Sequence, residues 1–151
     1  MVVGTAPTMQ EFWRMMKGLT ASARQAINAR LEGVGLSSAA GDIVFHLIPE
    51  EGGLSQEELC RRLGVGKAAV SRTVDALVSK GYTRREAHPK DARAHLVLLT
   101  DTGREAGARV AQAYGGVFGT LMRGISPEEL AGMARLLERI RRNLAEGQPA
   151  E

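Results

Sequence analysis

The side chains best suited to bind a charged partner are concentrated in one third of the chain. Residues 61–93 contain nine basic and three acidic side chains, a net charge of +6, so the remainder of this +3 chain sums to −3. A localised positive charge of this kind is typical of proteins that bind a polyanion such as nucleic acid. A solvated charged surface is the alternative. The nine basic residues are Arg61, Arg62, Lys67, Arg72, Lys80, Arg84, Arg85, Lys90 and Arg93.

Two predicted helices and a hairpin position these charges. Ser55 and Glu58 have the spacing of a capping box, which starts a short helix that ends at Gly64. A second helix is predicted from about residue 67 to 80, ending at Gly81. Residues 82–87 and 95–99 read as two strands joined by residues 88–93. A short helix, a tight turn and a longer helix form the layout that places a recognition helix in a DNA major groove.

Long amphipathic helices are predicted at both ends of the chain. Thr8 and Glu11 form a capping box for a helix that reaches about Glu32, some 25 residues or about 37 Å in length. One small domain cannot cover the whole apolar stripe of such a helix. This stripe consists of Phe12, Trp13, Met16, Leu19, Ala23, Ile27 and Leu31.

Three further helices complete the expected fold. One starts at Ser37 or Ser38, stops at Pro49 and is expected to turn Ala40, Ile43, Val44, Leu47 and Ile48 inward. Another follows a cap at Thr100 or Asp101 and continues to about residue 123. The last begins at Ser126, with Glu129 three residues on, and carries Leu130, Met133, Leu136, Leu137, Ile140 and Leu144.

The expected fold class is mainly α with a small β-hairpin wing (α+β), in one domain over residues 1–151. A winged helix-turn-helix over about 36–100 is flanked by dimerisation helices over about 8–33 and 101–146. Apolar stripes far apart in sequence favour an intertwined homodimer, and a symmetric dimer suits a pseudo-palindromic DNA site.

Composition argues against several other classes of protein. One cysteine, Cys60, excludes an intrachain disulfide framework, and no signal peptide or apolar run of about 18 residues is present, so a cytoplasmic protein is expected. There is no phosphate loop, metal-hydrolase helix or nucleophile elbow, so neither an enzyme nor a cofactor is expected. His46, His88 and His95 are too scattered to predict a metal site.

Four segments together resemble the MarR family of bacterial transcriptional regulators. They are residues 54–65, 67–81 and 82–85, and the wing segment 88–93, whose Asp91-Ala-Arg93 precedes Leu99-Thr100. Asp, any residue and Arg at a wing tip before Leu-Thr is the most specific of these signals. The resemblance implies a homodimer held by its terminal helices, a repressor or activator of transcription, and DNA affinity that a small molecule often lowers.

The recognition helix is expected to offer Lys67, Ala68, Ala69, Ser71 and Arg72 to DNA, with Val70, Val74 and Leu77 facing inward. Arg72 can read guanine bidentately or clamp a phosphate, and a surface salt bridge is the alternative for it. The family usually has polar residues where Ala68 and Ala69 lie. Their methyl groups cannot donate hydrogen bonds, so few specific contacts to base edges are predicted. The alternative function is therefore a winged-helix protein-interaction module with weak or no operator binding.

The wing is expected to insert Arg93 into a minor groove. Asp91 is predicted to hold the Arg93 guanidinium in a bidentate pair, while Lys90 and His88 meet phosphates. A solvated loop with a local ion pair is the alternative reading of this segment.

A small organic ligand, aromatic or anionic, is the preferred signal. In the family its pocket lies between the dimer helices and the winged module. The candidate residues here are Trp13, Arg14 or Lys17, Asp42, Phe45 and His46.

The sequence also contains the residues for two alternative signals. Asp42, Arg72 and Arg85 are similar to part of the pattern in urate-responsive members, although Trp13 does not fall at the matching position. A redox-responsive regulator acting through Cys60 is a further alternative, against the simpler reading of Cys60 as a small buried side chain.

Overall fold

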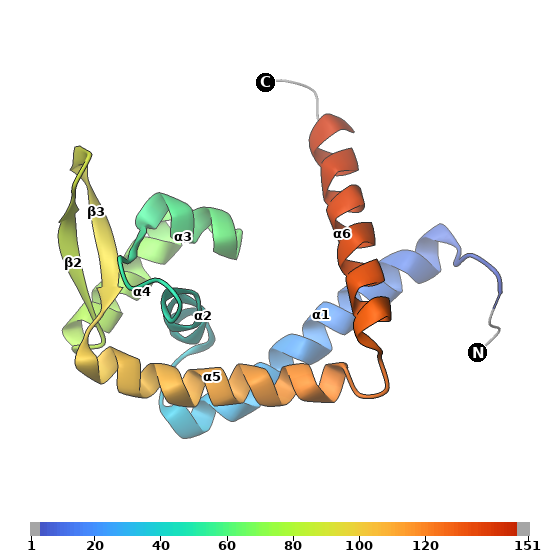
Figure 1. Ribbon diagram of the computed structural model, residues 1–151, viewed down its shortest axis with the longest axis horizontal. Helices are drawn as coiled ribbons and strands as arrows, with labels where there is room; N and C mark the ends of the chain where they lie inside the picture. Colours follow the sequence, from blue (N-terminus) through green and yellow to red (C-terminus); the bar gives the residue numbers. More distant parts are fainter. Residues whose placement is uncertain (1–3, 148–151) are drawn as a thin grey trace. The chain divides into compact units, whose positions relative to one another are not determined.

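The computed structural model describes residues 4–147 and divides into two compact units, residues 1–117 and 118–151. Figure 1 shows the order of the elements along the chain. The helices of the first unit and the junction are α1 (Met9–Leu31), the 3-10 turn η1 (Glu32–Val34), α2 (Ser38–Leu47), α3 (Gln56–Leu63), α4 (Lys67–Ser79) and α5 (Asp101–Leu121), which crosses into the second unit. The second unit adds α6 (Pro127–Gly147).

A three-stranded antiparallel sheet forms the wing and its base. Its order is β1-β3-β2, with β1 at Leu54–Ser55, β2 at Thr83–His88 and β3 at Asp91–Leu99. Leu54 pairs with Val97, and Thr83 pairs with Leu99. The β2–β3 hairpin extends away from the helices that support it (Figure 1). The predicted mainly α fold with a small β-hairpin wing is therefore confirmed.

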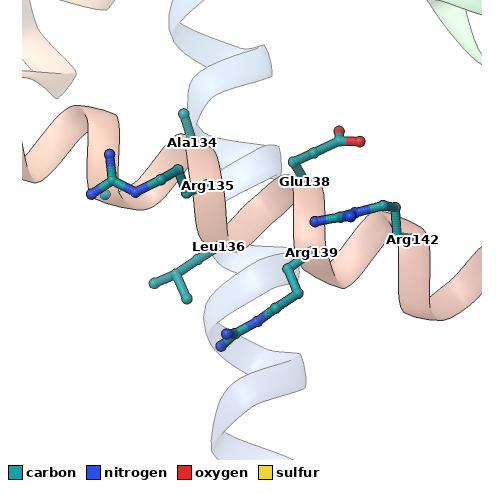
Figure 2. Close-up of a pocket in the computed structure, with 7 residues that line it drawn as sticks. Ala134, Arg135, Leu136, Glu138, Arg139 and Arg142 are labelled. Atoms are coloured by element: carbon teal, nitrogen blue, oxygen red, sulfur yellow. The ribbon is translucent and has the colours of Figure 1, made fainter.

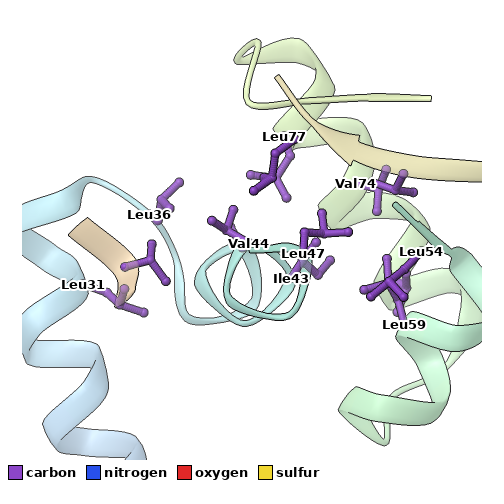
Figure 3. Packing of buried hydrophobic residues seen from close by; sticks show 14 of the residues in the cluster. Leu31, Leu36, Ile43, Val44, Leu47, Leu54, Leu59, Val74 and Leu77 are labelled. Carbon is purple, nitrogen blue, oxygen red and sulfur yellow. The ribbon is translucent and has the colours of Figure 1, made fainter. Parts of the chain in front are cut away.

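The core of the first unit is built around α2. Ile43, Val44 and Leu47 are at most 1% exposed, and Figure 3 shows them between the side chains of α4, α3 and the end of α1. Leu77 and Val74 approach from α4, as the helical spacing predicts. This packing fixes the recognition helix on a rigid base.

Several predicted boundaries and contacts were wrong. The strands run almost to the wing tip, so Asp91 and Arg93 lie in β3 and not in a loop, and the two-residue strand β1 was not predicted. Ile48 is 39% exposed instead of buried. Ser55 caps α3, but the Glu58 carboxylate turns to Arg61 and Arg62 instead of closing the capping box.

The start of α5 is tied closely to the end of α4. The Thr100 hydroxyl donates to the Gly81 carbonyl at 2.5 Å and accepts from the Gly103 amide at 3.0 Å. The Thr100 amide donates to the Tyr82 carbonyl at 3.0 Å. Gly103 packs directly on this turn, because a Cβ there would lie 1.9 Å from the Tyr82 carbonyl oxygen. The junction between the recognition helix, the wing and α5 is therefore tight.

Thr83 offers a direct test of this core. It is 2% exposed, and its Oγ1 has no hydrogen-bond partner among the described residues. Thr83→Val replaces the buried hydroxyl with a methyl group of similar shape and should raise the free energy of unfolding by roughly 1 kcal/mol. Urea denaturation followed by circular dichroism measures the change.

Thr73→Val is the matched control for that substitution, because the Thr73 hydroxyl donates to the Ala69 carbonyl at 3.0 Å. Equal effects of the two substitutions would contradict an orphaned Thr83 hydroxyl.

Across residues 4–147, none of the helices combines the length and apolarity needed to span a membrane.

Candidate nucleic-acid interface

The recognition helix presents a small polar surface. Lys67, Ala68 and Arg72 are exposed on α4, whereas Ala69 and Ser71 are half-buried. Val70, Val74 and Leu77 are at most 1% exposed and point into the core, as predicted. Lys67 and Arg72 are therefore the charged groups that α4 offers along its first turns.

The wing tip differs from its predicted geometry. The Asp91 carboxylate accepts a hydrogen bond from the Arg93 backbone amide at 2.9 Å, and no ion pair between the two side chains is formed among the described residues. The predicted bidentate pair was therefore wrong. His88 Nδ1 accepts from the Lys90 amide at 3.1 Å, which folds the turn. Asp91 thus orders the backbone and leaves the Arg93 guanidinium available.

Local acids neutralise only part of the basic segment. Arg62 pairs with Glu50 and Glu58 at 2.9 and 2.8 Å, and Arg61 pairs with Glu58 at 2.6 Å. The guanidinium groups of Arg61 and Arg62 lower the pKa of Glu58 to about 2. Arg84 pairs with Glu86, and Arg85 pairs with Asp75. Within residues 4–147, the five members of the segment without an ion pair are Lys67, Arg72, Lys80, Lys90 and Arg93.

These five unpaired cations lie on α4 and at the wing tip. Lys67, Arg72 and Lys80 mark the start, the middle and the C-terminal cap of α4, and Lys90 and Arg93 mark the hairpin end. A helix and a wing that both carry uncompensated positive charge can contact phosphates along one face of a duplex. Of the nine basic residues in the segment, these five are therefore the ones whose charge is available for DNA.

The predicted ligand residues are only partly brought together. Asp42 on α2 pairs with Arg24 on α1 at 2.9 Å and accepts from the hydroxyl of Tyr114 on α5. Phe45 stacks on the Tyr114 ring, with centroids 4.2 Å apart. Burial and the Asp42 carboxylate raise the pKa of Tyr114, so this phenol stays protonated. Asp42 and Phe45 therefore join three helices, through two partners that no local sequence pattern marks.

The remaining candidates lie apart from this cluster. Trp13 is 62% exposed, and its ring packs edge-on against Phe12 at 5.9 Å. His46 contacts Phe45 edge-on at 5.6 Å. Asp42 pairs with Arg24, and Arg85 pairs with Asp75. Asp42, Arg72 and Arg85 therefore do not form one cluster in the described contacts, as the similarity to urate-responsive members would require.

Two small cavities flank Thr73 on α4. One of about 90 Å³ is lined by Asp42, by Thr73 and by apolar residues of α2, α3, α4 and the α3–α4 turn. The other, of about 190 Å³, has Arg72 and Lys80 among its lining residues. Neither cavity is lined by Trp13, Phe45 or His46.

The second unit carries a broad groove along α6 of about 790 Å³ (Figure 2). The described residues that line it all belong to α6, and they include Arg135, Arg139 and Arg142. A groove along one exposed helix does not enclose a ligand.

Cys60 is half-buried and packs against the hydrophobic core, which fits the simpler reading of this residue. No group of three or more His, Cys, Asp or Glu side chains within residues 4–147 could hold a metal ion.

Comparison with known proteins identifies the module that carries these cations. Residues 34–94 match the model of the MarR family. The winged module belongs to the MarR family. This MarR-family segment contains α2, α3, α4, β2 and the wing tip, so all five unpaired cations lie within it.

Relatives of the MarR-family module extend the likeness over most of the chain. An uncharacterised helix-turn-helix transcriptional regulator, YdgJ of Bacillus subtilis, is 33% identical over 91 residues, which cover 60% of this chain and 56% of that protein. The matched segment therefore spans little more than half of this relative's length. The crystal structure of transcriptional regulator PA3341 is 29% identical, with a TM-score of 0.82, and the match covers 89% of this chain and 98% of that one.

A further solved structure of similar fold contains a bound ligand. The structure of CouR from Rhodococcus jostii RHA1 bound to p-coumaroyl-CoA has a TM-score of 0.81 at 19% identity, covering 97% of this chain and all of that one. At this level of identity the likeness shows the shared fold.

Proposed function

We propose that this chain is a cytoplasmic, homodimeric transcriptional repressor that binds a pseudo-palindromic operator in double-stranded DNA and is released by a small aromatic or anionic ligand. The observation that carries the proposal is the set of five unpaired cations on α4 and the wing tip of a MarR-family module. Lys67, Lys80 and Lys90 contact phosphates, Arg72 reads a major-groove edge with Ser71 beside it, and Arg93 enters a minor groove. Ala68 and Ala69 offer only methyl contacts.

Operator binding is tested by fluorescence anisotropy with the full chain and duplex from its own upstream promoter. Tight binding should fall steeply with salt, by roughly 10³-fold between about 50 and 200 mM if Lys67, Lys80 and Lys90 of both protomers neutralise about six phosphates. A random duplex of equal length, measured at matched salt, is the control. Equal affinity for the two duplexes would instead favour the protein-interaction module.

Support for the ligand comes from the Asp42 cluster and from the CouR complex. The Arg24–Asp42–Tyr114 contacts join α1, α2 and α5, and the Arg24 side chain is 44% exposed, so an anionic group can approach it. Adding p-coumaroyl-CoA or free p-coumarate to the same anisotropy titration measures release from the operator. Release by either probe supports an anionic aromatic ligand, and no effect at saturating concentrations excludes both probes.

Support for the homodimer comes from apolar side chains that the described residues leave uncovered. On α1, Met9, Trp13 and Leu19 are 68%, 62% and 56% exposed. On α6, the exposed apolar side chains are Met133, Leu136, Leu137, Ile140 and Leu144. Such continuous apolar stripes are stable in water only when another surface covers them. A second copy of the chain supplies the matching stripe by symmetry.

Leu137→Asp should break this dimer, because it buries a charge in the proposed interface. Light scattering coupled to gel filtration should give about twice the 16.2 kDa chain mass for the original protein and one chain mass for the variant. Ala131→Asp is the matched control: Ala131 is exposed and lies about 120° around α6 from Leu137. A Leu137→Asp protein that stays dimeric would remove α6 from the interface.

A further inference from the structure

One ion pair connects the recognition helix with the wing. Arg85 Nη2 on β2 donates to Asp75 Oδ1 on α4 at 2.5 Å. Among the ion pairs within residues 4–147, this is the one that joins α4 to the β2–β3 hairpin. The neighbouring Arg84 behaves differently, since it pairs with Glu86 on its own strand and donates to the Leu99 carbonyl. Arg84 and Arg85 thus have different partners, because successive side chains of a strand point to opposite faces of the sheet.

The location of Asp75 is unusual for a DNA-facing helix. Its side chain is 62% exposed, and it lies three residues after Arg72 and four after Ser71, so all three share one face of α4. A carboxylate on that face would repel phosphates if it were not neutralised. Arg85, with a side chain only 28% exposed, supplies the opposing charge from the wing side.

The Asp75–Arg85 pair lies at the base of the wing, where a small rotation of the hairpin moves the wing tip over a larger distance. Arg85 is three residues before His88 at the end of β2, about 10 Å along the strand at roughly 3.3 Å per residue. A change of angle at Arg85 therefore displaces Lys90 and Arg93 relative to Arg72. The remaining support between the two elements is the turn at Gly81 and the apolar packing of Val74 and Leu77.

We propose that Asp75 and Arg85 are positioning residues, whose ion pair holds the wing at the angle to the recognition helix that DNA binding requires. In this arrangement neither side chain contacts DNA. The inference rests on the proposed function, because it assigns a role within operator binding. The competing role is a direct phosphate contact by Arg85, with Asp75 as a repulsive neighbour.

A double-mutant cycle separates these roles. Asp75→Ala, Arg85→Ala and the double variant should each weaken operator binding by roughly three- to tenfold, with no further loss in the double variant. The slope of log affinity against log salt should be unchanged by Arg85→Ala, because no phosphate contact is lost. The charge swap Asp75→Arg with Arg85→Asp should recover most of the affinity.

Arg84 provides the matched control cycle. Arg84→Ala removes the same charge from the adjacent position, and its effect should add to that of Asp75→Ala, because these two side chains are not partners. Tighter binding by Asp75→Ala, together with a shallower salt slope in Arg85→Ala, would overturn the positioning role in favour of a direct phosphate contact.

A measurement without DNA keeps this inference separate from the proposed function. Hydrogen exchange in the full chain should be faster over residues 86–96 in both Asp75→Ala and Arg85→Ala, restored by the charge swap, and unchanged in α5. Unaltered exchange in the hairpin would overturn the inference even if the operator is bound. If the original protein shows no preference for promoter DNA, the proposed function fails, and hydrogen exchange alone decides whether the pair positions the wing.

Discussion

Replacing Arg93 with alanine is expected to weaken operator binding by well over tenfold. The guanidinium has no ion pair among the described residues, and the Asp91 carboxylate orders the backbone beneath it. A narrow, negative minor groove attracts such a group, and a hydrogen bond made by a charged group contributes roughly 1.5–3 kcal/mol. A dimer loses two of these contacts. Anisotropy titrations at physiological salt measure the loss.

The controls for Arg93→Ala distinguish a local contact from a change in net charge. Arg141→Ala removes a positive charge from α6, where Arg141 pairs with Glu138 at 2.7 Å, and should leave operator affinity within about twofold. Gel filtration should show the Arg93→Ala protein in the same oligomeric state as the original chain. Unchanged affinity in Arg93→Ala would remove the wing from the DNA interface.

Gly103→Ala is expected to destabilise the fold by about 3 kcal/mol, near the upper end of the usual cost of overpacking. The added Cβ would lie 1.9 Å from the Tyr82 carbonyl oxygen and 2.9 Å from its carbon. Both are backbone atoms, so no side-chain rotation relieves the contact, and α5 must shift away from the turn after α4. The urea midpoint, followed by circular dichroism, should fall with little change in slope.

Gly115→Ala is the matched substitution in the same helix. No heavy atom lies within 4 Å of a Cβ at Gly115, and the residue is exposed. Alanine there should stabilise the helix by about 0.5–1 kcal/mol, because it restricts the unfolded chain. If the two alanine substitutions had the same effect, close packing at Gly103 would be contradicted.

The winged helix-turn-helix could be predicted because its signals are local. Ser55 and Gly64 mark the two ends of α3, and Gly81, with φ of +77°, ends the segment after α4. The capping boxes at Thr8 and at Ser126 fixed the starts of α1 and α6 within one or two residues. Each signal lies within three residues of the element it delimits, so one sequence is enough to read it.

Contacts between distant segments were not accessible in the same way. Strand β1 has only two residues and exists because Leu54 pairs with Val97. Arg24, Asp42 and Tyr114 come from three separate helices, and their spacing carries no periodic pattern. The Asp75–Arg85 pair depends on where the chain turns after Gly81. Glu58 shows the converse error: its spacing fits a capping box, but nearby arginines compete successfully for the carboxylate.

The Thr100 hydroxyl has a further consequence for how the protein opens. It satisfies the Gly81 carbonyl and the Gly103 amide at once, while the Thr100 amide satisfies the Tyr82 carbonyl. These bonds join the turn that follows the recognition helix to the first turn of α5. Segments that share hydrogen bonds in this way open together as one cooperative unit. In this protein, the turn after the recognition helix and the first turn of α5 are therefore expected to exchange their amide hydrogens together.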